Sequence, residues 1–185
     1  MEGAGVSGVR LELASGYNQT PGFVHLDGNA ATRPDIVADF RALPMFADGS
    51  VAEIRAIDCL EHCSYTETDA ALAEWARVLA YGGLIYIQVP DAALIMRWFV
   101  ESPEKLINRC PSHLPQTALA GAAWRLLGGH NDGVYAKAGD DWKWNCHGAM
   151  FSEASLTDAL ERVGLAVETL EINGHPNLCA WAVKV

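Results

Sequence analysis

Residues 84–89, Leu-Ile-Tyr-Ile-Gln-Val, constrain the fold more than any other part of the sequence. They follow a Gly-Gly pair and stop at Pro90, which has no N–H group to donate to a strand ladder. The run is apolar on both faces, which is typical of a central strand in a parallel sheet. It therefore predicts an α/β protein whose sheet is covered by helices.

Further strands and one helix are expected ahead of this run. Short β-prone segments that end near turns or carboxylates predict strands at residues 9–14, 23–27, 35–39 and 51–57. From Thr66 the apolar residues recur with helical spacing, so a helix is expected there, with Thr66 and Asp69 at its amino-terminal cap and Gly82-Gly83 as its stop.

The second half of the chain predicts helices followed by a strand pair. Residues 91–128 are expected to form two helical pieces divided by prolines, and residues 131–150 show no clear period. A helix should begin after Ser152 and end at Gly164. Strands at 166–172 and 178–184 are joined by a short turn and should form an antiparallel hairpin.

These elements predict one domain over residues 1–185. The expected fold is a Rossmann-like, open and mostly parallel sheet with helices on both faces and a C-terminal antiparallel strand pair. Its ligand cleft should lie at the carboxyl ends of the strands, with residues 91–150 as a helical and loop insert facing the substrate.

The link between the first two strands is unusually short. Only residues 17–26 lie between Gly16 and Asp27, whereas a right-handed crossover normally needs a dozen or more residues and a helix. The first crossover helix is therefore expected to be reduced or missing.

Composition limits the partners and the compartment. A net charge of −10 with 13 Lys and Arg argues against gripping a nucleic acid backbone. The five cysteines suggest neither a disulfide framework nor a zinc knuckle, so a reducing cytoplasm is expected. No leader or membrane span is apparent, and a homodimer is one assembly that the sequence allows.

The order of several segments resembles that of class I S-adenosylmethionine-dependent methyltransferases. The segments are residues 11–16, Asp27, 38–44, 47–50 and 58–62, followed by Arg-Val-Leu-Ala-Tyr-Gly-Gly-Leu at 77–84. The tail, with Gly-Gly-His at 128–130 and Phe151, resembles a small, type 11-like branch. The resemblance implies methyl transfer with S-adenosylmethionine as cofactor, but it does not identify the acceptor.

Asp27 is expected to hold the cofactor ribose, and Gly16 to let the backbone approach the ligand. Asp27 ends the second strand, where a carboxylate can accept both hydroxyls, although it could instead form a turn before Gly28. Gly16 leaves room for the ligand, whereas Ala14 stands where the family commonly has its first glycine.

Other acidic positions match the family's cofactor contacts. The resemblance implies that Asp39 accepts the adenine amino group, with Phe40 or Leu43 beside the ring, unless Asp39 is a solvated loop residue. Glu12 would lie near the methionine end, or else be an exposed strand residue. Asp58, after the fourth strand, would lie close to the reactive methyl group.

The acceptor side is expected to contain histidines and aromatic residues. His62 and His147 are the candidate bases, although a lone histidine such as His62 is more often a structural residue than a base. The predicted substrate contacts are Tyr17, His130, Trp142 and His147. The group His130, Asp132, Cys146 and His147 matches no tight zinc spacing, and no metal is expected.

The sequence thus predicts transfer of a methyl group from S-adenosylmethionine to a small-molecule or sugar-type acceptor. The alternative is a non-catalytic, methyltransferase-like binding or partner module that has lost full cofactor binding. A nicotinamide-dependent oxidoreductase is disfavoured because no Gly-x-Gly-x-x-Gly follows the first strand.

Overall fold

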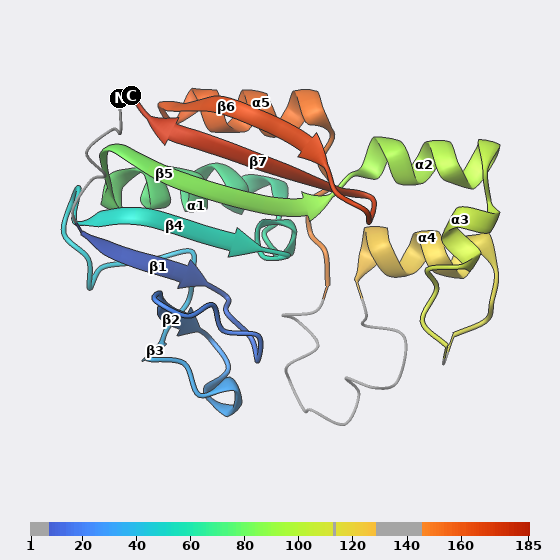
Figure 1. Ribbon diagram of the computed structural model, residues 1–185, viewed down its shortest axis with the longest axis horizontal. Coiled ribbons are helices and arrows are strands. Elements are labelled where there is room, and N and C mark those ends of the chain that lie inside the picture. Colours follow the sequence, from blue (N-terminus) through green and yellow to red (C-terminus); the bar gives the residue numbers. More distant parts are fainter. Residues whose placement is uncertain (1–7, 113, 129–145) are drawn as a thin grey trace.

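A seven-stranded sheet forms the centre of the protein (Figure 1). The structure is a computed structural model that describes residues 8–112, 114–128 and 146–185. The strands follow the order β3-β2-β1-β4-β5-β7-β6. Their bounds are β1 Val9–Leu13, β2 Val24–Asp27, β3 Ile36–Val37, β4 Val51–Ile57, β5 Leu79–Pro90, β6 Leu165–Ile172 and β7 Asn177–Lys184.

Five α-helices and two short 3-10 helices are present in the described part of the chain. They are α1 Tyr65–Val78, α2 Ala92–Glu101, α3 Glu104–Ile107, α4 Ala118–Leu127, α5 Glu153–Arg162, η1 Ala30–Thr32 and η2 Leu60–His62.

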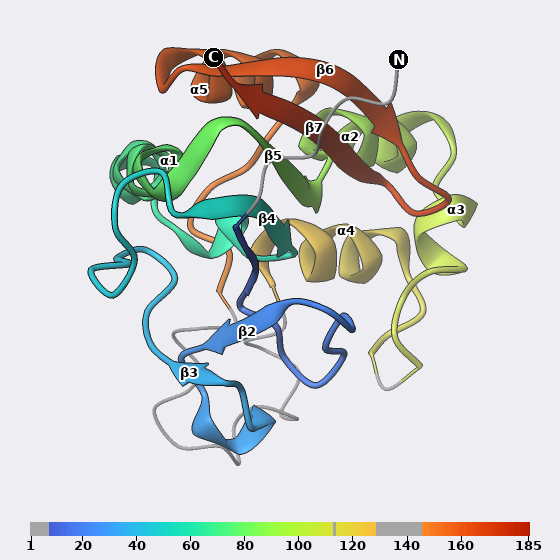
Figure 2. The same ribbon diagram turned by 60° about the vertical axis from the view of Figure 1, so that its left-hand side comes forward.

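The strand directions confirm the predicted fold class. Neighbouring strands from β3 to β5 run parallel, whereas β7 is antiparallel to both β5 and β6. The β6–β7 pair with α5 lies at one edge of the sheet, and β2 and β3 lie at the other (Figures 1 and 2). Helices α2, α3 and α4 lie beyond the ends to which β4 and β5 point (Figure 1).

The main hydrophobic core lies on one face of the sheet. Side chains that alternate along β1, β4 and β5 point to this face, and α1 and α5 cover it with Leu72, Trp75 and Leu156. Trp75 is fully buried, and its indole N–H donates to the carbonyl of Phe40 at 2.8 Å. Buried apolar area of this kind stabilises by about 25 cal/mol per Å².

The opposite face of the sheet carries polar and aromatic side chains instead of an apolar core, so the two faces are covered unequally. In register across the sheet, Glu12 pairs with Arg55, Arg55 with Tyr86, and Tyr86 with Trp181. The Tyr86 and Trp181 rings lie 4.6 Å apart, and the Arg55 guanidinium lies 5.2 Å from the Tyr86 ring. A row of polar and aromatic side chains, only part-buried beyond Glu12, therefore replaces an apolar layer here.

The first crossover helix is missing, as the short link predicts. Residues 14–23, all of them described, form turns and bends between β1 and β2. The second crossover is also small, because only η1 lies between β2 and β3.

Several expected boundaries were wrong. Helix α1 begins after Ser64 rather than at Thr66, because Glu67 accepts hydrogen bonds from both the Ser64 N–H and its hydroxyl at 2.8 Å. It ends at Val78, since Leu79 already pairs with Val51, so the Gly82-Gly83 pair lies within β5 at a shift of register.

Two further elements differ from expectation. The third strand covers Ile36–Val37 rather than residues 35–39, because the chain turns again at Asp39. Residues 91–128 form three helices instead of two pieces, with α3 adding one turn after Pro103. No helix in the described residues is long and apolar enough to cross a membrane.

Candidate functional site

A pocket of about 380 Å³ opens at the carboxyl ends of β1 and β4. Its walls are the strand ends and the loop that replaces the crossover helix. The lining residues are Glu12, Leu13, Ala14, Ser15, Gly16, Tyr17, Asn18, Thr20, Arg55, Ile57 and Asp58. The pocket therefore brings together five predicted site residues, namely Glu12, Ala14, Gly16, Tyr17 and Asp58.

Asp27 is held next to this pocket by two backbone amides. Its Oδ2 accepts from Gly16 N at 2.8 Å, and its Oδ1 accepts from Asn29 N at 2.7 Å. Bonds from neutral donors to a charged acceptor are strong and fix the direction of the carboxylate. Each oxygen has a second lone pair, so the group can still accept two ligand hydroxyls.

Glu12 is engaged inside the protein. Its side chain accepts from the Thr20 N–H at 2.8 Å and from the Thr20 hydroxyl at 2.6 Å. Arg55 Nε lies 3.3 Å from Glu12 Oε1, and the glutamate is 4% exposed. These contacts explain how a carboxylate is tolerated in a buried strand, and they fasten the β1–β2 loop to β1.

Sequence reasoning missed Arg55. It lies in the middle of β4 at a position that alternation assigns to the face opposite the core, and a lone arginine there is an ordinary surface residue in sequence. Its register partner Glu12 was the available signal, because an acid and a base on adjacent strands make a cross-strand pair.

Two non-glycine residues of the pocket have left-handed backbone conformations. Ala14 has φ 49° and Asp58 has φ 49°. Alanine is disfavoured in this conformation, whereas glycine adopts it without strain. Such outliers gather at turns that position ligands. Asp58 also accepts from Gln88 Nε2 at 3.0 Å, which orients its carboxylate.

Asp39 and Phe40 lie outside the pocket. Arg41 donates to both oxygens of Asp39, from Nε at 2.9 Å and from Nη2 at 2.7 Å. Although burial opposes it, this pairing leaves the pKa of Asp39 below its usual value. Phe40 is 6% exposed and packs against Trp75 in the core, and Leu43 is fully buried. Their roles beside an adenine ring stay predictions.

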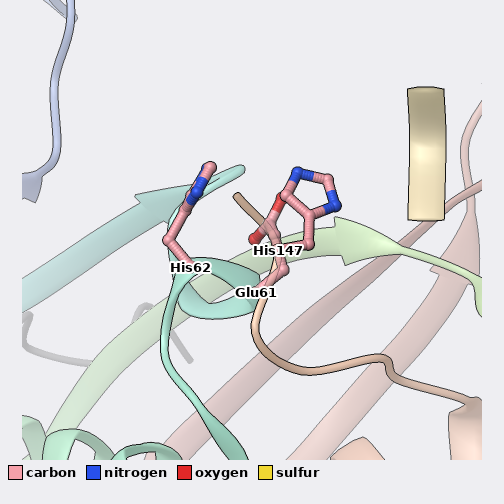
Figure 3. Close-up of side chains that lie close together, drawn as sticks. All are labelled: Glu61, His62 and His147. Carbon is pink, nitrogen blue, oxygen red and sulfur yellow. The ribbon is translucent and has the colours of Figure 1, made fainter. Parts of the chain in front are cut away.

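A second group of polar side chains lies just past Asp58, where η2 meets residues 146–149. Glu61, His62 and His147 come together there, as Figure 3 shows, and the two imidazole rings lie 5.0 Å apart, edge to face. His62 and His147 were both predicted, but their proximity was not. His130 and Trp142 lie outside the described residues.

Burial shifts the protonation of this group. It raises the pKa of Glu61 well above its usual value, with the negative charge of Asp58 adding to the effect. It lowers the pKa of His62, although the Cys146 carbonyl opposes that shift. His62 is therefore a neutral imidazole near pH 7, able to accept a proton or to bind a metal ion.

One comparison with known proteins matches a family over part of the chain, and another matches the fold. A family model described as "Methyltransferase domain" matches residues 3–87. That range contains both the pocket and the η2 part of the histidine group. Among curated proteins, none matches the sequence significantly.

Solved structures share the fold at low identity. A protein from Pyrococcus horikoshii is 15% identical with TM-score 0.60, covering 100% of this chain and 85% of that one. A Thermotoga maritima S-adenosylmethionine-dependent methyltransferase, described as a possible histamine N-methyltransferase, is 14% identical with TM-score 0.58, covering 97% and 84%.

A third structure contains ligands. The 1,6-didemethyltoxoflavin-N1-methyltransferase from Burkholderia thailandensis, with its substrate and S-adenosylhomocysteine bound, is 14% identical with TM-score 0.58 and covers 96% of this chain and 71% of that one. The match over residues 3–87 shows that this part of the chain is similar to a methyltransferase domain, and the solved structures share the fold of the chain.

Proposed function

We propose that this protein transfers the methyl group of S-adenosylmethionine to a small-molecule or sugar-type acceptor. The observation that carries the proposal is Asp27, whose two oxygens are aligned by Gly16 N and Asn29 N at the edge of the pocket. A ribose presents two adjacent hydroxyls, and an oriented carboxylate is the complementary acceptor.

The residues of the pocket fit such a cofactor. At Gly16, with φ +55°, an added Cβ would meet no atom within 4 Å, so open space lies beside the ribose acceptor. Arg55 lines the pocket and supplies positive charge for the carboxylate of the methionine end. The Glu12 carboxylate already contacts Thr20 and Arg55. We therefore assign two roles to Glu12: it shapes the wall of the pocket, and one of its oxygens accepts from the amino group of the methionine end.

When bound, the cofactor would supply an electrophilic sulfonium methyl group, which the acceptor atom would attack in line at carbon with S-adenosylhomocysteine as the leaving group. The chain's own contribution is to hold the two partners in that geometry, which alone accounts for a large part of such rate enhancements. Asp58 lies between the pocket and the histidine pair, and His62, neutral near pH 7, is placed to take a proton from the acceptor. His147 lies beside it.

The acceptor would enter from the side of the insert. We assign substrate contact to Tyr17, which is 75% exposed at the pocket, and to residues 91–150, whose helices α2 to α4 lie beyond the carboxyl ends of the strands. His130 and Trp142 belong to the same assignment. The five free thiols favour the reducing cytoplasm as the compartment of the protein. A homodimer is the assembly we propose, and sedimentation measures it.

One observation favours the second candidate, a methyltransferase-like module without catalysis. The loop over residues 14–23 lacks the helix whose amino-terminal amides and apolar face would cover a cofactor. A protein of this kind would bind S-adenosylhomocysteine weakly and transfer no methyl group.

Ligand-dependent melting separates these possibilities. At 100 times its Kd, S-adenosylhomocysteine stabilises a protein by about 2.7 kcal/mol, or roughly 5–11 °C for a chain of this size. Asp27→Asn keeps the shape but loses the charge, and we expect its affinity to fall about 10- to 150-fold, equivalent to about 1.5–3 kcal/mol.

Asp69→Asn is the matched control, since Asp69 is exposed on α1 and pairs only at the surface with Arg162. No melting shift at millimolar S-adenosylhomocysteine, or equal shifts in Asp27→Asn and the wild type, would refute the cofactor site. A clear shift without methyl transfer to any component of a metabolite extract would favour the non-catalytic module.

A further inference from the structure

The group formed by Glu61, His62 and His147 has the composition of a metal site. One ligand atom from each residue, a carboxylate oxygen and two imidazole nitrogens, lies within 4.8 Å of the others. Two histidines and one carboxylate form the ligand set of many zinc enzymes and of non-haem iron centres. In Figure 3 the two rings lie near one another, almost perpendicular, with the Glu61 carboxylate beside His147.

Glu61 is the strongest sign that something is bound here. Its side chain belongs to a residue that is 1% exposed, and neither carboxylate oxygen accepts a hydrogen bond of normal geometry from the described residues, although the backbone N–H groups of Cys59 and Glu61 lie nearby. An isolated carboxylate is costly to bury, and buried charged groups are normally paired or coordinate a metal. A cation at this point would satisfy both oxygens at once.

His62 is prepared for coordination by its neighbour. Its Nδ1 lies 3.2 Å from the Cys146 carbonyl, which can only accept, so Nδ1 carries the proton and donates. That tautomer leaves the lone pair on Nε2. A backbone carbonyl behind the far nitrogen is the usual second contact of a metal-bound histidine, because it fixes the tautomer and the ring orientation.

The backbone brings the two chain segments together. The Glu61 carbonyl accepts from Gly148 N at 2.7 Å and from Ala149 N at 3.2 Å, next to His147. Gly148 is essential to this approach, because a Cβ there would lie 2.6 Å from the Cys63 carbonyl oxygen. The histidine of the later segment is thus held beside η2 by main-chain contacts rather than by side-chain packing alone.

We propose that Glu61, His62 and His147 bind one divalent transition-metal ion, with Zn²⁺ as the first choice. Zinc bonds of about 2.0–2.2 Å place neighbouring ligand atoms roughly 3.4 Å apart. The widest separation in the group, up to 4.8 Å, must therefore shorten by up to about 1.4 Å, which rotations of the side chains provide. Three protein ligands leave a coordination position open, as in catalytic rather than structural zinc sites.

The open coordination position has a consequence for methyl transfer, and this consequence rests on the function proposed above. With a metal bound, His62 and His147 would be ligands and not free bases. An acceptor oxygen bound at the open position would lose its proton to solvent more readily, because a metal lowers the pKa of bound hydroxyl groups. The ion would then both orient and activate the acceptor next to Asp58.

Metal binding is measured on the full chain without cofactor. After dialysis against a chelator, the wild type should bind about one equivalent of Zn²⁺ in calorimetry, and Co²⁺ should give a spectrum of nitrogen and oxygen ligation without thiolate charge-transfer bands. Glu61→Gln and His147→Asn should each weaken Zn²⁺ binding by at least about 10-fold, the scale of even indirect losses at metal sites.

His175→Asn is the control, because His175 is an exposed histidine in the turn between β6 and β7. Circular dichroism of each variant shows whether it is folded. Substoichiometric Zn²⁺, thiolate ligation of Co²⁺, or equal affinities in the wild type and in folded Glu61→Gln would overturn the proposal. Binding of S-adenosylhomocysteine to the chelator-treated protein is scored separately, so that failure of the metal site and failure of the cofactor site are distinguishable.

Discussion

The contact between Glu12 and Thr20 is expected to hold the whole β1–β2 loop in place. Both donors of Thr20, its N–H at 2.8 Å and its hydroxyl at 2.6 Å, point at the Glu12 carboxylate. Glu12→Gln keeps the size of the side chain but leaves only one accepting oxygen. One of the two bonds is lost, and an amide N–H₂ is turned toward Thr20 or Arg55.

The cost follows from the number and type of these bonds. A hydrogen bond to a charged group contributes about 1.5–3 kcal/mol, and a neutral one about 1 kcal/mol. Glu12→Gln should therefore lower the free energy of unfolding by about 2 kcal/mol, which corresponds to roughly 4–8 °C in Tm for a chain of this length. Thr20→Val removes the hydroxyl alone, and with it one bond to the charged carboxylate, so it should cost about 1.5–3 kcal/mol.

A double-mutant cycle in urea isolates the pairwise contribution. Because the two side chains are in contact, the double variant should be less destabilised than the sum of the single variants by about 1 kcal/mol. Glu168→Gln, at an exposed position of β6, is the matched control and should change stability by less than about 0.5 kcal/mol. A loss below about 0.5 kcal/mol in Glu12→Gln, or strict additivity, would refute the role assigned to this contact.

Two further outcomes are expected from other parts of the fold. Gly148→Ala should destabilise by about 1–3 kcal/mol in urea unfolding, because the new Cβ meets Cys63 backbone, whereas Gly174→Ala, which meets no atom within 4 Å, should be close to neutral; similar costs for the two would contradict this. The pKa of Glu67 is lowered, first by the Ser64 N–H, so its stabilisation exists above its usual pKa of 4.5 and is lost as the pH falls through the lower folded value. Glu67→Ala should therefore lower the free energy of unfolding by about 1 kcal/mol at pH 7, a value reduced by solvent screening at the surface. In urea unfolding at a series of pH values, the difference in free energy between this variant and the wild type should shrink below pH 4.5. A difference that stays constant with pH would contradict this reasoning.

The sheet was predictable because its strands obey local rules. Two local patterns each indicate a single arrangement of strands. The apolar run of β5 predicts a central strand in a parallel sheet, and the short turn before β7 predicts an antiparallel hairpin. The structure confirms the strand directions that these patterns predict. The absence of the first crossover helix was predictable from the number of residues between the first two strands alone. The end of α1 was not, because Gly82-Gly83 is an equally good signal for a helix stop and for an irregular strand, and pairing of Leu79 with Val51 decides between them.

The candidate site was predictable only where it follows the strand ends. Gly16 and Asp58 were found because strand-end positions can be counted from the sequence, whereas Ala14 was singled out only by the resemblance to methyltransferases. The role of Arg55 was missed, since a cross-strand partner depends on register, which β4 and β1 set together. The meeting of His147 with Glu61 and His62 joins segments more than 80 residues apart in sequence through the carbonyl of Glu61, and no local pattern encodes it.

The position of Asp27 has a consequence for motion as well as for binding. Asp27 ends β2, a strand of four residues, and the neighbouring edge strand β3 has only two residues. The carboxylate is therefore carried by the part of the sheet with the shortest strands. Short edge elements open locally at a small fraction of the global free energy of unfolding. A ligand that ties Asp27 to Gly16 would suppress that opening, so the amide hydrogens of β2 should exchange with solvent far more slowly in the bound protein. Recognition at this edge is therefore coupled to the ordering of the strand that carries it.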